Sequence, residues 1–133
     1  MAAPFAWQTR VRFVDTDASG RIHFTAMFRF FEAAEQEFLG SKGLRYHRIE
    51  VGHVAYPRVR VECNYTGALT SDDIVTIAVS VERIGKTSFT LAFRAECEGK
   101  PVADGKIVVV CMDRRSQKAS LLPEELAKSL AEG

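Results

Sequence analysis

The fold is decided by residues 9–39, which read TRVRFVDTDASGRIHFTAMFRFFEAAEQEFL. Polar and apolar side chains alternate over residues 9–14, and the segment DTDASG at 15–20 then breaks the alternation. Alternation of period two indicates a strand, and a run of Asp, Thr, Ser and Gly indicates a tight turn. We therefore expect a first strand that enters a loop, and such loops often carry chemistry.

A helix is predicted from about residue 25 to residue 39, because apolar side chains cover most of the helical circumference there. Only a narrow polar stripe remains, at Arg29, Glu32 and Gln36. Thr25 is a suitable N-cap, while Gly40 and Gly43 can end the helix because glycine adopts positive φ at little cost. A helix with so little polar surface has to be wrapped by other elements.

Strands are predicted in the second half of the chain, where the hydrophobic period changes to two. The runs lie at residues 59–65, 75–81 and 89–97, and a further strand at about 107–112 is apolar on both faces. In the first run, Arg58, Arg60 and Glu62 are expected on a solvated face. A short amphipathic helix is expected over residues 124–131.

This order of elements predicts an α+β fold, in which an antiparallel sheet of about five strands wraps around one long central helix. The chain has 133 residues and neither a linker nor an internal repeat, so residues 1–133 are expected to form a single domain. One flank of the helix would stay uncovered in a single chain, and we therefore expect a homodimer or homotetramer.

Net charge, cysteine spacing and hydrophobic run lengths argue against several classes of protein. A net charge of +1 provides no general field for nucleic acid or an anionic membrane, so neither partner is expected. The three cysteines lie far apart without a CxxC pair, which indicates neither a disulfide framework nor a zinc site. The chain also lacks a signal-peptide pattern and a run of about 18 apolar residues, so a cytoplasmic location is expected.

The segment VDTDASG at residues 14–20, followed by the aromatic-rich stretch 24–39, resembles the signature of the 4-hydroxybenzoyl-CoA thioesterase family. The likeness continues through three later segments: the strand after Pro57, the Asp72-Asp73 turn and the sequence KTSF at 86–89. It covers about residues 8–112. The resemblance implies the hotdog fold and hydrolysis of an acyl-CoA thioester to a free acid and CoA.

The resemblance also implies a catalytic role for Asp17, the second aspartate of the motif, either as the nucleophile or as the general base for water. A carboxylate is able to attack the thioester carbonyl or to take a proton from water, and the residues leave that choice open. The oxyanion would be held by the amide of about Phe24, at the helix N-terminus. Some relatives have a histidine at the place of Phe24, whereas here His23 lies one position earlier as a candidate second catalytic group.

Substrate contacts follow from the resemblance as well. Gly20 completes the motif and is expected beside the substrate. In the family, the helix position that matches Glu32 can reach the acyl group, sometimes across the dimer interface, so Glu32 is a candidate substrate contact. Basic residues at hairpin and strand ends hold CoA phosphates in the family, which implies as candidates Arg83, Lys86, Arg114 and Arg115. Aromatic, short branched and medium straight acyl chains all stay open.

Other interpretations of the DTDASG segment are weaker. Asp17 could be a turn residue that only caps its own loop, while Asp15 is expected to be structural, as an Asx-turn residue. A calcium loop fails at its twelfth position, where Ala26 replaces the required glutamate. The sequence therefore implies no metal site and no cofactor.

Two further functions stay open beside acyl-CoA hydrolysis. The first is hydrolysis of an acyl group carried by an acyl carrier protein, and the second is noncatalytic binding of acyl-CoA. A pure binder has no need of Asp17 near an acyl carbonyl, because the carboxylate would repel an anionic product. A hydratase of the same fold would use a histidine-and-acid signature that we do not find in this sequence.

Overall fold

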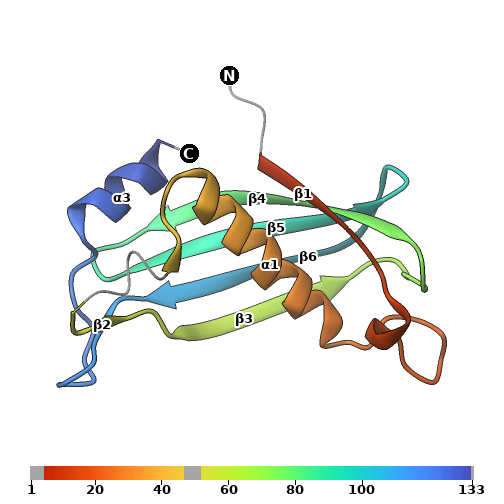
Figure 1. Ribbon diagram of the computed structural model, residues 1–133, viewed down its shortest axis with the longest axis horizontal. Coiled ribbons are helices and arrows are strands. Elements are labelled where there is room, and N and C mark those ends of the chain that lie inside the picture. Colours follow the sequence, from red (N-terminus) through yellow and green to blue (C-terminus); the bar gives the residue numbers. More distant parts are fainter. Residues whose placement is uncertain (1–4, 47–51, 133) are drawn as a thin grey trace.

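A sheet of antiparallel strands carries the long helix α1 (Ala26–Ser41) across one face (Figure 1). The computed structural model describes residues 5–46 and 52–132. In that part of the chain the sheet has five strands, in the order β1-β4-β5-β6-β3. Their bounds are Phe5–Arg10 for β1, Ile74–Ile84 for β4, Ser88–Cys97 for β5, Lys100–Val110 for β6 and Arg58–Tyr65 for β3. This is the expected α+β hotdog arrangement.

Three smaller elements complete the fold. The strands β2 (Val54–Ala55) and β7 (Met112–Asp113) pair with each other beside the main sheet. The helix α3 (Glu124–Ala131) packs against β4 and buries Leu126 and Leu130, which confirms the predicted C-terminal helix. It lies at the end of the sheet away from the N-terminus of α1 (Figure 1). Across the described ranges, every helix is too short or too polar to span a lipid bilayer.

The first strand ends earlier than expected. β1 stops at Arg10, and a turn of 3-10 helix, η1 (Phe13–Asp15), replaces the rest of the predicted strand at 9–14. The backbone turns because the Asp15 carboxylate accepts the Arg12 N–H at 2.8 Å. Both apolar side chains of η1 are exposed in consequence. The alternation of residue types continued past the point where this hydrogen bond ended the strand.

The hydrophobic core lies between α1 and the sheet. Phe31 of α1 stacks on Phe93 of β5 with the ring centroids 4.6 Å apart. Gly105 of β6 makes this approach possible, because a Cβ on Gly105 would lie 2.6 Å from the Phe31 ring. Each fully buried phenylalanine contributes roughly 1.5–3 kcal/mol to folding. The central helix is therefore fixed by close packing as well as by apolar burial.

The ends of α1 match the prediction in position but not in every contact. Thr25 occupies the N-cap, yet its hydroxyl makes no capping hydrogen bond and instead lies 2.8 Å from Nδ1 of His23. Gly43 has a φ of +72° just beyond the helix, as expected. The expected role of Gly40 is wrong, because it lies inside the helix. A Cβ there would be 2.7 Å from the guanidinium carbon of Arg45, so Gly40 provides room for that side chain.

A bulge in the edge strand β3 changes which residues face the helix. The register places Arg58 opposite Val109, which is fully buried under α1. It then places Arg60 opposite Val108, and this leaves Val59 as an extra residue in β3. Arg58 is therefore turned toward the helix side of the sheet, and the prediction that it belongs to a solvated face is wrong. A one-residue bulge leaves no mark in hydrophobic periodicity.

The remainder of β3 alternates as predicted, but the side chains that face the helix side of the sheet are only partly buried. Val61 and Tyr65 share a face with the buried residues of β6 and are still 43% and 44% exposed. The cause is position, since β3 is an edge strand that pairs with β6 on one side only. A partly apolar strand edge is thus open in the single chain.

A buried polar cluster connects α1 to β3. Glu35 of α1 is 0% exposed and forms an ion pair with Arg58. Nη2 of Arg58 also donates to the Tyr46 hydroxyl at 2.7 Å, and the guanidinium lies over the Tyr46 ring. Burial raises the pKa of Glu35, and the positive charge of Arg58 partly offsets that rise. Helical periodicity did not identify Glu35 as a buried residue.

Candidate active site

The loop between η1 and α1 doubles back on itself before the helix begins. The Asp17 N–H donates to the Arg21 carbonyl at 2.9 Å, and the Gly20 N–H donates to the Asp17 carbonyl at 3.0 Å. Gly20 has a φ of +83° and nothing within 4 Å of where a Cβ would be. Glycine is required there for its backbone conformation, not for space. The loop therefore presents the side chain of Asp17 at a tight turn.

The Asp17 carboxylate is exposed and ionised by local hydrogen bonds. Its Oδ1 accepts the Ser19 N–H at 2.8 Å and the Ser19 hydroxyl at 2.6 Å. These two bonds hold the pKa of Asp17 below its usual value, with a smaller contribution from the charge of His23. This is also the geometry of a turn aspartate that caps its own loop. Oδ2, however, has no hydrogen bond within the described part of the chain, so one oxygen is available to a ligand.

Asp15 ties the loop to the body of the protein. Its carboxylate is buried, accepts the Arg12 N–H and forms an ion pair with Arg29 of α1 at 3.0 Å. Its carbonyl accepts the His23 N–H at 2.7 Å. A structural role was expected for Asp15, but the predicted Asx turn is wrong. In an Asx turn the carboxylate accepts a backbone N–H two residues later, whereas here it accepts the N–H of Arg12, three residues earlier. Asp15 therefore connects Arg12 at the start of the loop, His23 at its end and Arg29 in the helix.

His23 and Phe24 stack on each other immediately before α1. Their ring centroids are 4.6 Å apart, and the Phe24 side chain is 65% exposed. The Thr25 N–H donates to Nδ1 of His23 at 3.2 Å. Because a backbone N–H can only donate, Nδ1 is an acceptor, and the neutral ring carries its proton on Nε2. His23 can therefore donate a hydrogen bond from Nε2.

The backbone amide of Phe24 is free at the start of the helix. The amides around it all have acceptors: Ile22 N–H bonds to Leu69, His23 N–H to Asp15, and the N–H groups of Thr25 and Ala26 to His23. No acceptor for the Phe24 N–H occurs among residues 5–46 and 52–132. A free amide at the positive end of a helix dipole is suited to hold a developing negative charge.

A small hollow lies beside Phe24. Its volume is about 220 Å³, and it is lined by Arg21, Ile22, Phe24, Tyr65, Gly67, Ala68 and Leu69. Asp17 is on the same loop but is not among the lining residues. Tyr65 donates a hydrogen bond from its hydroxyl to the Phe24 carbonyl. The hollow is large enough for only part of a thioester substrate.

Sequence reasoning missed Tyr65 as a member of this site. Its place in the alternation of β3 predicted only an inward-facing strand residue. The available signal was its position, since Tyr65 is the last residue of the strand that runs beside α1. Strand ends next to a functional loop often contribute to a site, but the partner loop could not be identified before the chain was folded.

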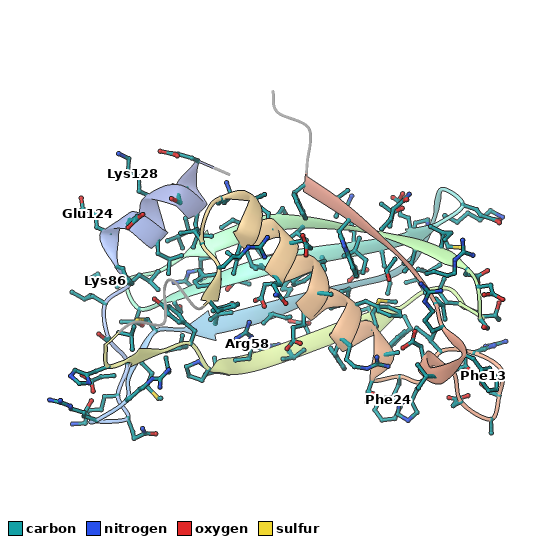
Figure 2. All side chains as sticks on the ribbon, in the orientation of Figure 1. Phe13, Phe24, Arg58, Lys86, Glu124 and Lys128 are labelled. Atoms are coloured by element: carbon teal, nitrogen blue, oxygen red, sulfur yellow. The ribbon has the colours of Figure 1, made fainter. Side chains whose placement is uncertain are left out.

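The remaining predicted substrate contacts do not converge with this loop within one chain. Glu32 is exposed on α1, and its charge acts on Glu35 and Arg58. Arg83 and Lys86 are exposed on the β4–β5 hairpin. Figure 2 shows Lys86 and Phe24 at opposite ends of the molecule. Arg114 and Arg115 follow β7, where the Nε of Arg114 donates to the Val54 carbonyl.

No metal-binding arrangement is evident in the described residues, where no three His, Cys, Asp or Glu side chains come together as a ligand set. The cysteines are free thiols, of which Cys111 is buried. The chemistry available at the loop is therefore that of a carboxylate, an imidazole and a backbone amide.

Comparison with known proteins gives a consistent result. A family model described as Thioesterase-like superfamily matches residues 11–130 of the chain. A relative from Aquifex aeolicus, provisionally named as an esterase, is 31% identical over 117 residues, which covers 80% of this chain and 91% of the relative. A 1,4-dihydroxy-2-naphthoyl-CoA hydrolase from Synechococcus elongatus is 27% identical over 126 residues and is covered to 93%, as is this chain.

The fold is also found among solved structures. The crystal structure of a hypothetical protein from Aquifex aeolicus superposes with a TM-score of 0.89 at 29% identity. The superposition covers 96% of this chain and 99% of that chain. The likeness thus extends over the full arrangement of sheet and central helix.

Proposed function

The chain belongs to the thioesterase-like superfamily, and on that premise we propose that it is an acyl-CoA thioesterase in which Asp17 acts on the thioester carbonyl. One observation carries the proposal. An exposed, ionised carboxylate and the free amide of Phe24 lie on one loop that leads into the N-terminus of α1. The two groups are those that thioester hydrolysis needs, one to start the attack and one to hold the oxyanion.

Asp17 supplies the attack in either of two ways. As a general base it takes a proton from water, which then attacks the carbonyl, and as a nucleophile it forms a mixed anhydride that water hydrolyses. The lowered pKa keeps the carboxylate ionised at neutral pH, as both routes require. In each route the C–S bond breaks and CoA leaves as a thiolate that takes up a proton.

The start of α1 supports the oxyanion. The Phe24 N–H has no other acceptor in the described chain, and the positive end of the helix dipole adds to its effect. Nε2 of His23, next to it, carries the proton of the neutral ring and can donate a hydrogen bond to the carbonyl oxygen, while the leaving thiolate takes its proton from water. The charge that develops in the transition state therefore meets donors that are already oriented.

A second copy of the chain would complete the site. The open edge of β3 has unpaired backbone groups and partly exposed Val61 and Tyr65, which suits antiparallel pairing with the same edge of another subunit. Such pairing reverses the partner's direction. It brings the hairpin of the partner subunit toward the end where Asp17 lies, so that Arg83 and Lys86 of the partner subunit can approach the CoA phosphates. We therefore propose a homodimer, or a tetramer built from it.

The test is a panel of acyl-CoA thioesters, in which aryl-CoA compounds come first because one relative is a 1,4-dihydroxy-2-naphthoyl-CoA hydrolase. Release of free thiol is measured for the wild type and for Asp17→Asn, each shown to be folded by its melting curve. We expect thiol release by the wild type with at least one compound and a large loss in the variant. Tight binding without any thiol release would indicate a noncatalytic acyl-CoA binder. Turnover only with acyl carrier protein would change the carrier but not the chemistry.

A further inference from the structure

Tyr65 links two parts of the chain that meet at the proposed site. It is the last residue of β3, and its hydroxyl donates to the carbonyl of Phe24, which lies 41 residues earlier. Within the described residues this is the one side-chain hydrogen bond between β3 and the segment that precedes α1. Tyr65 also lines the hollow beside Phe24 and is 44% exposed.

The Phe24 carbonyl depends on Tyr65 because the helix does not use it. Phe24 precedes the N-cap Thr25, so its carbonyl lies outside the helix, whose first acceptor is the Thr25 carbonyl. Here the Phe28 N–H donates to the Thr25 carbonyl at 3.2 Å, so the first turn is tightened to the i→i+3 pattern. No backbone N–H of the described chain donates to the Phe24 carbonyl. The Tyr65 hydroxyl therefore supplies a hydrogen bond to a carbonyl that has no backbone donor among the described residues.

The peptide group between His23 and Phe24 is fixed by a separate hydrogen bond. The His23 carbonyl, which shares a peptide plane with the Phe24 N–H, accepts the Ala26 N–H at 2.9 Å. In a trans peptide the carbonyl and the N–H point in opposite directions. The carbonyl of His23 faces the helix, and the free Phe24 N–H consequently faces away from it. Tyr65 fixes the following peptide group, between Phe24 and Thr25, through the Phe24 carbonyl. Both peptide groups that flank the Phe24 Cα are therefore fixed by hydrogen bonds.

We propose that Tyr65 is a positioning residue, whose hydroxyl anchors the Phe24 carbonyl and so keeps the free Phe24 N–H directed at the thioester oxygen. This inference rests on the proposed thioesterase function and adds to it a residue from a distant strand. Tyr65 does not act as an acid or a base. Burial and the neighbouring Cys63 raise the pKa of Tyr65 to about 12, so the hydroxyl remains a donor throughout a normal assay range.

The test is Tyr65→Phe, which removes the hydroxyl and keeps the ring in the hollow. Removal of one direct oxyanion donor costs about 100- to 1,000-fold in kcat, and we expect about a tenfold loss when the amide is only released from its anchor. KM should stay within about twofold, because the ring that lines the hollow is retained. The pH profile of kcat should keep its shape, since no titrating group is lost.

A matched control is Tyr46→Phe, which removes a hydroxyl from the buried cluster far from the hollow. We expect this control to lower the melting temperature and to leave kcat unchanged. A Tyr65→Phe enzyme with wild-type kcat would overturn the positioning role, and so would a change confined to KM. The complete absence of thiol release by the wild type would instead overturn the proposed function itself, together with this inference.

Discussion

Asp17 and Glu35 are carboxylates close together in the sequence but in opposite surroundings. Asp17 lies on an exposed loop, where hydrogen bonds from Ser19 lower its pKa. Glu35 lies on the buried face of α1, where burial raises its pKa and the positive charge of Arg58 partly offsets that rise. The first is held in its charged form at a place that is open to solvent. The second stabilises the packing of α1 on β3 at a place that no substrate reaches.

The proposed catalytic acid and the structural acid differ in exposure and in the free-energy cost of holding a charge in place. An exposed carboxylate loses little hydration free energy, and it can change its hydrogen-bond partners during a reaction. A buried ion pair requires desolvation of both charges, and loss of one partner leaves the other charge buried without compensation. It therefore resists a change of partners. The loop end of α1 should therefore govern rate, and its buried middle should govern stability.

The largest expected effect is on rate at the loop. Asp17→Asn should lower kcat by about a thousandfold, as expected for loss of a catalytic acid–base or nucleophilic group, with little change in the melting temperature. Glu35→Gln makes the same chemical change in the buried region and should do the reverse, lowering stability while kcat is retained. Thiol-release kinetics and thermal melts of both variants measure this. If Glu35→Gln abolished turnover in folded protein, the division between the two regions would be wrong.

The next effect is on stability at the buried pair. Arg58→Met should lower the free energy of unfolding by about 3 kcal/mol, because it leaves the Glu35 carboxylate buried without its partner. The double variant Glu35→Leu with Arg58→Met should recover most of that loss, since no buried charge then remains. Urea denaturation of the two variants and the wild type gives the values. Equal stability of the single and double variants would contradict the pairing.

A smaller effect is expected at the hairpin far from the loop. Lys86→Ala should raise KM for acyl-CoA by about two- to fivefold, as is usual for one exposed ion pair, and the difference should shrink at high salt. Lys128→Ala on α3 is a matched control, because it removes the same charge from the same end of the molecule (Figure 2). Initial rates at low and high salt measure both. Identical KM values for the two variants would argue against a contact between the hairpin and CoA.

The smallest effect is a shift in pH dependence at the loop. The Ser19 hydrogen bonds lower the pKa of Asp17, so the wild-type carboxylate stays ionised to a lower pH than a free aspartate. In Ser19→Ala the side-chain bond is lost, and the pKa should rise toward its usual value. The rate, which requires the carboxylate, should then begin to fall at a higher pH than in the wild type. A kcat profile through the acid range tests this, and an unmoved acid limb would exclude Ser19 as the cause.

Much of the fold could be predicted because the relevant signals are local. The period of apolar residues identified the central helix and the main strands, and their order identified the α+β class. The motif around Asp17 and Gly20 placed the proposed catalytic loop directly before the helix. Local signals failed where a single hydrogen bond changed the path, as at Asp15, which ended β1 early. They also failed at Gly40, which lies inside the helix with the Arg45 guanidinium packed against it and does not end the helix.

The sequence by itself determined the elements, the loop–helix junction and the candidate carboxylate, since these depend on neighbouring residues and short-range periodicity. Only the tertiary structure decided that Arg58 turns inward to meet Glu35, and that Tyr65 reaches back to Phe24. It also placed Lys86 at the end opposite the loop. These facts depend on strand register, on a one-residue bulge and on residues far apart in the chain. Contacts of that kind are fixed by packing of the whole sheet against the helix, and residue patterns within one segment do not encode them.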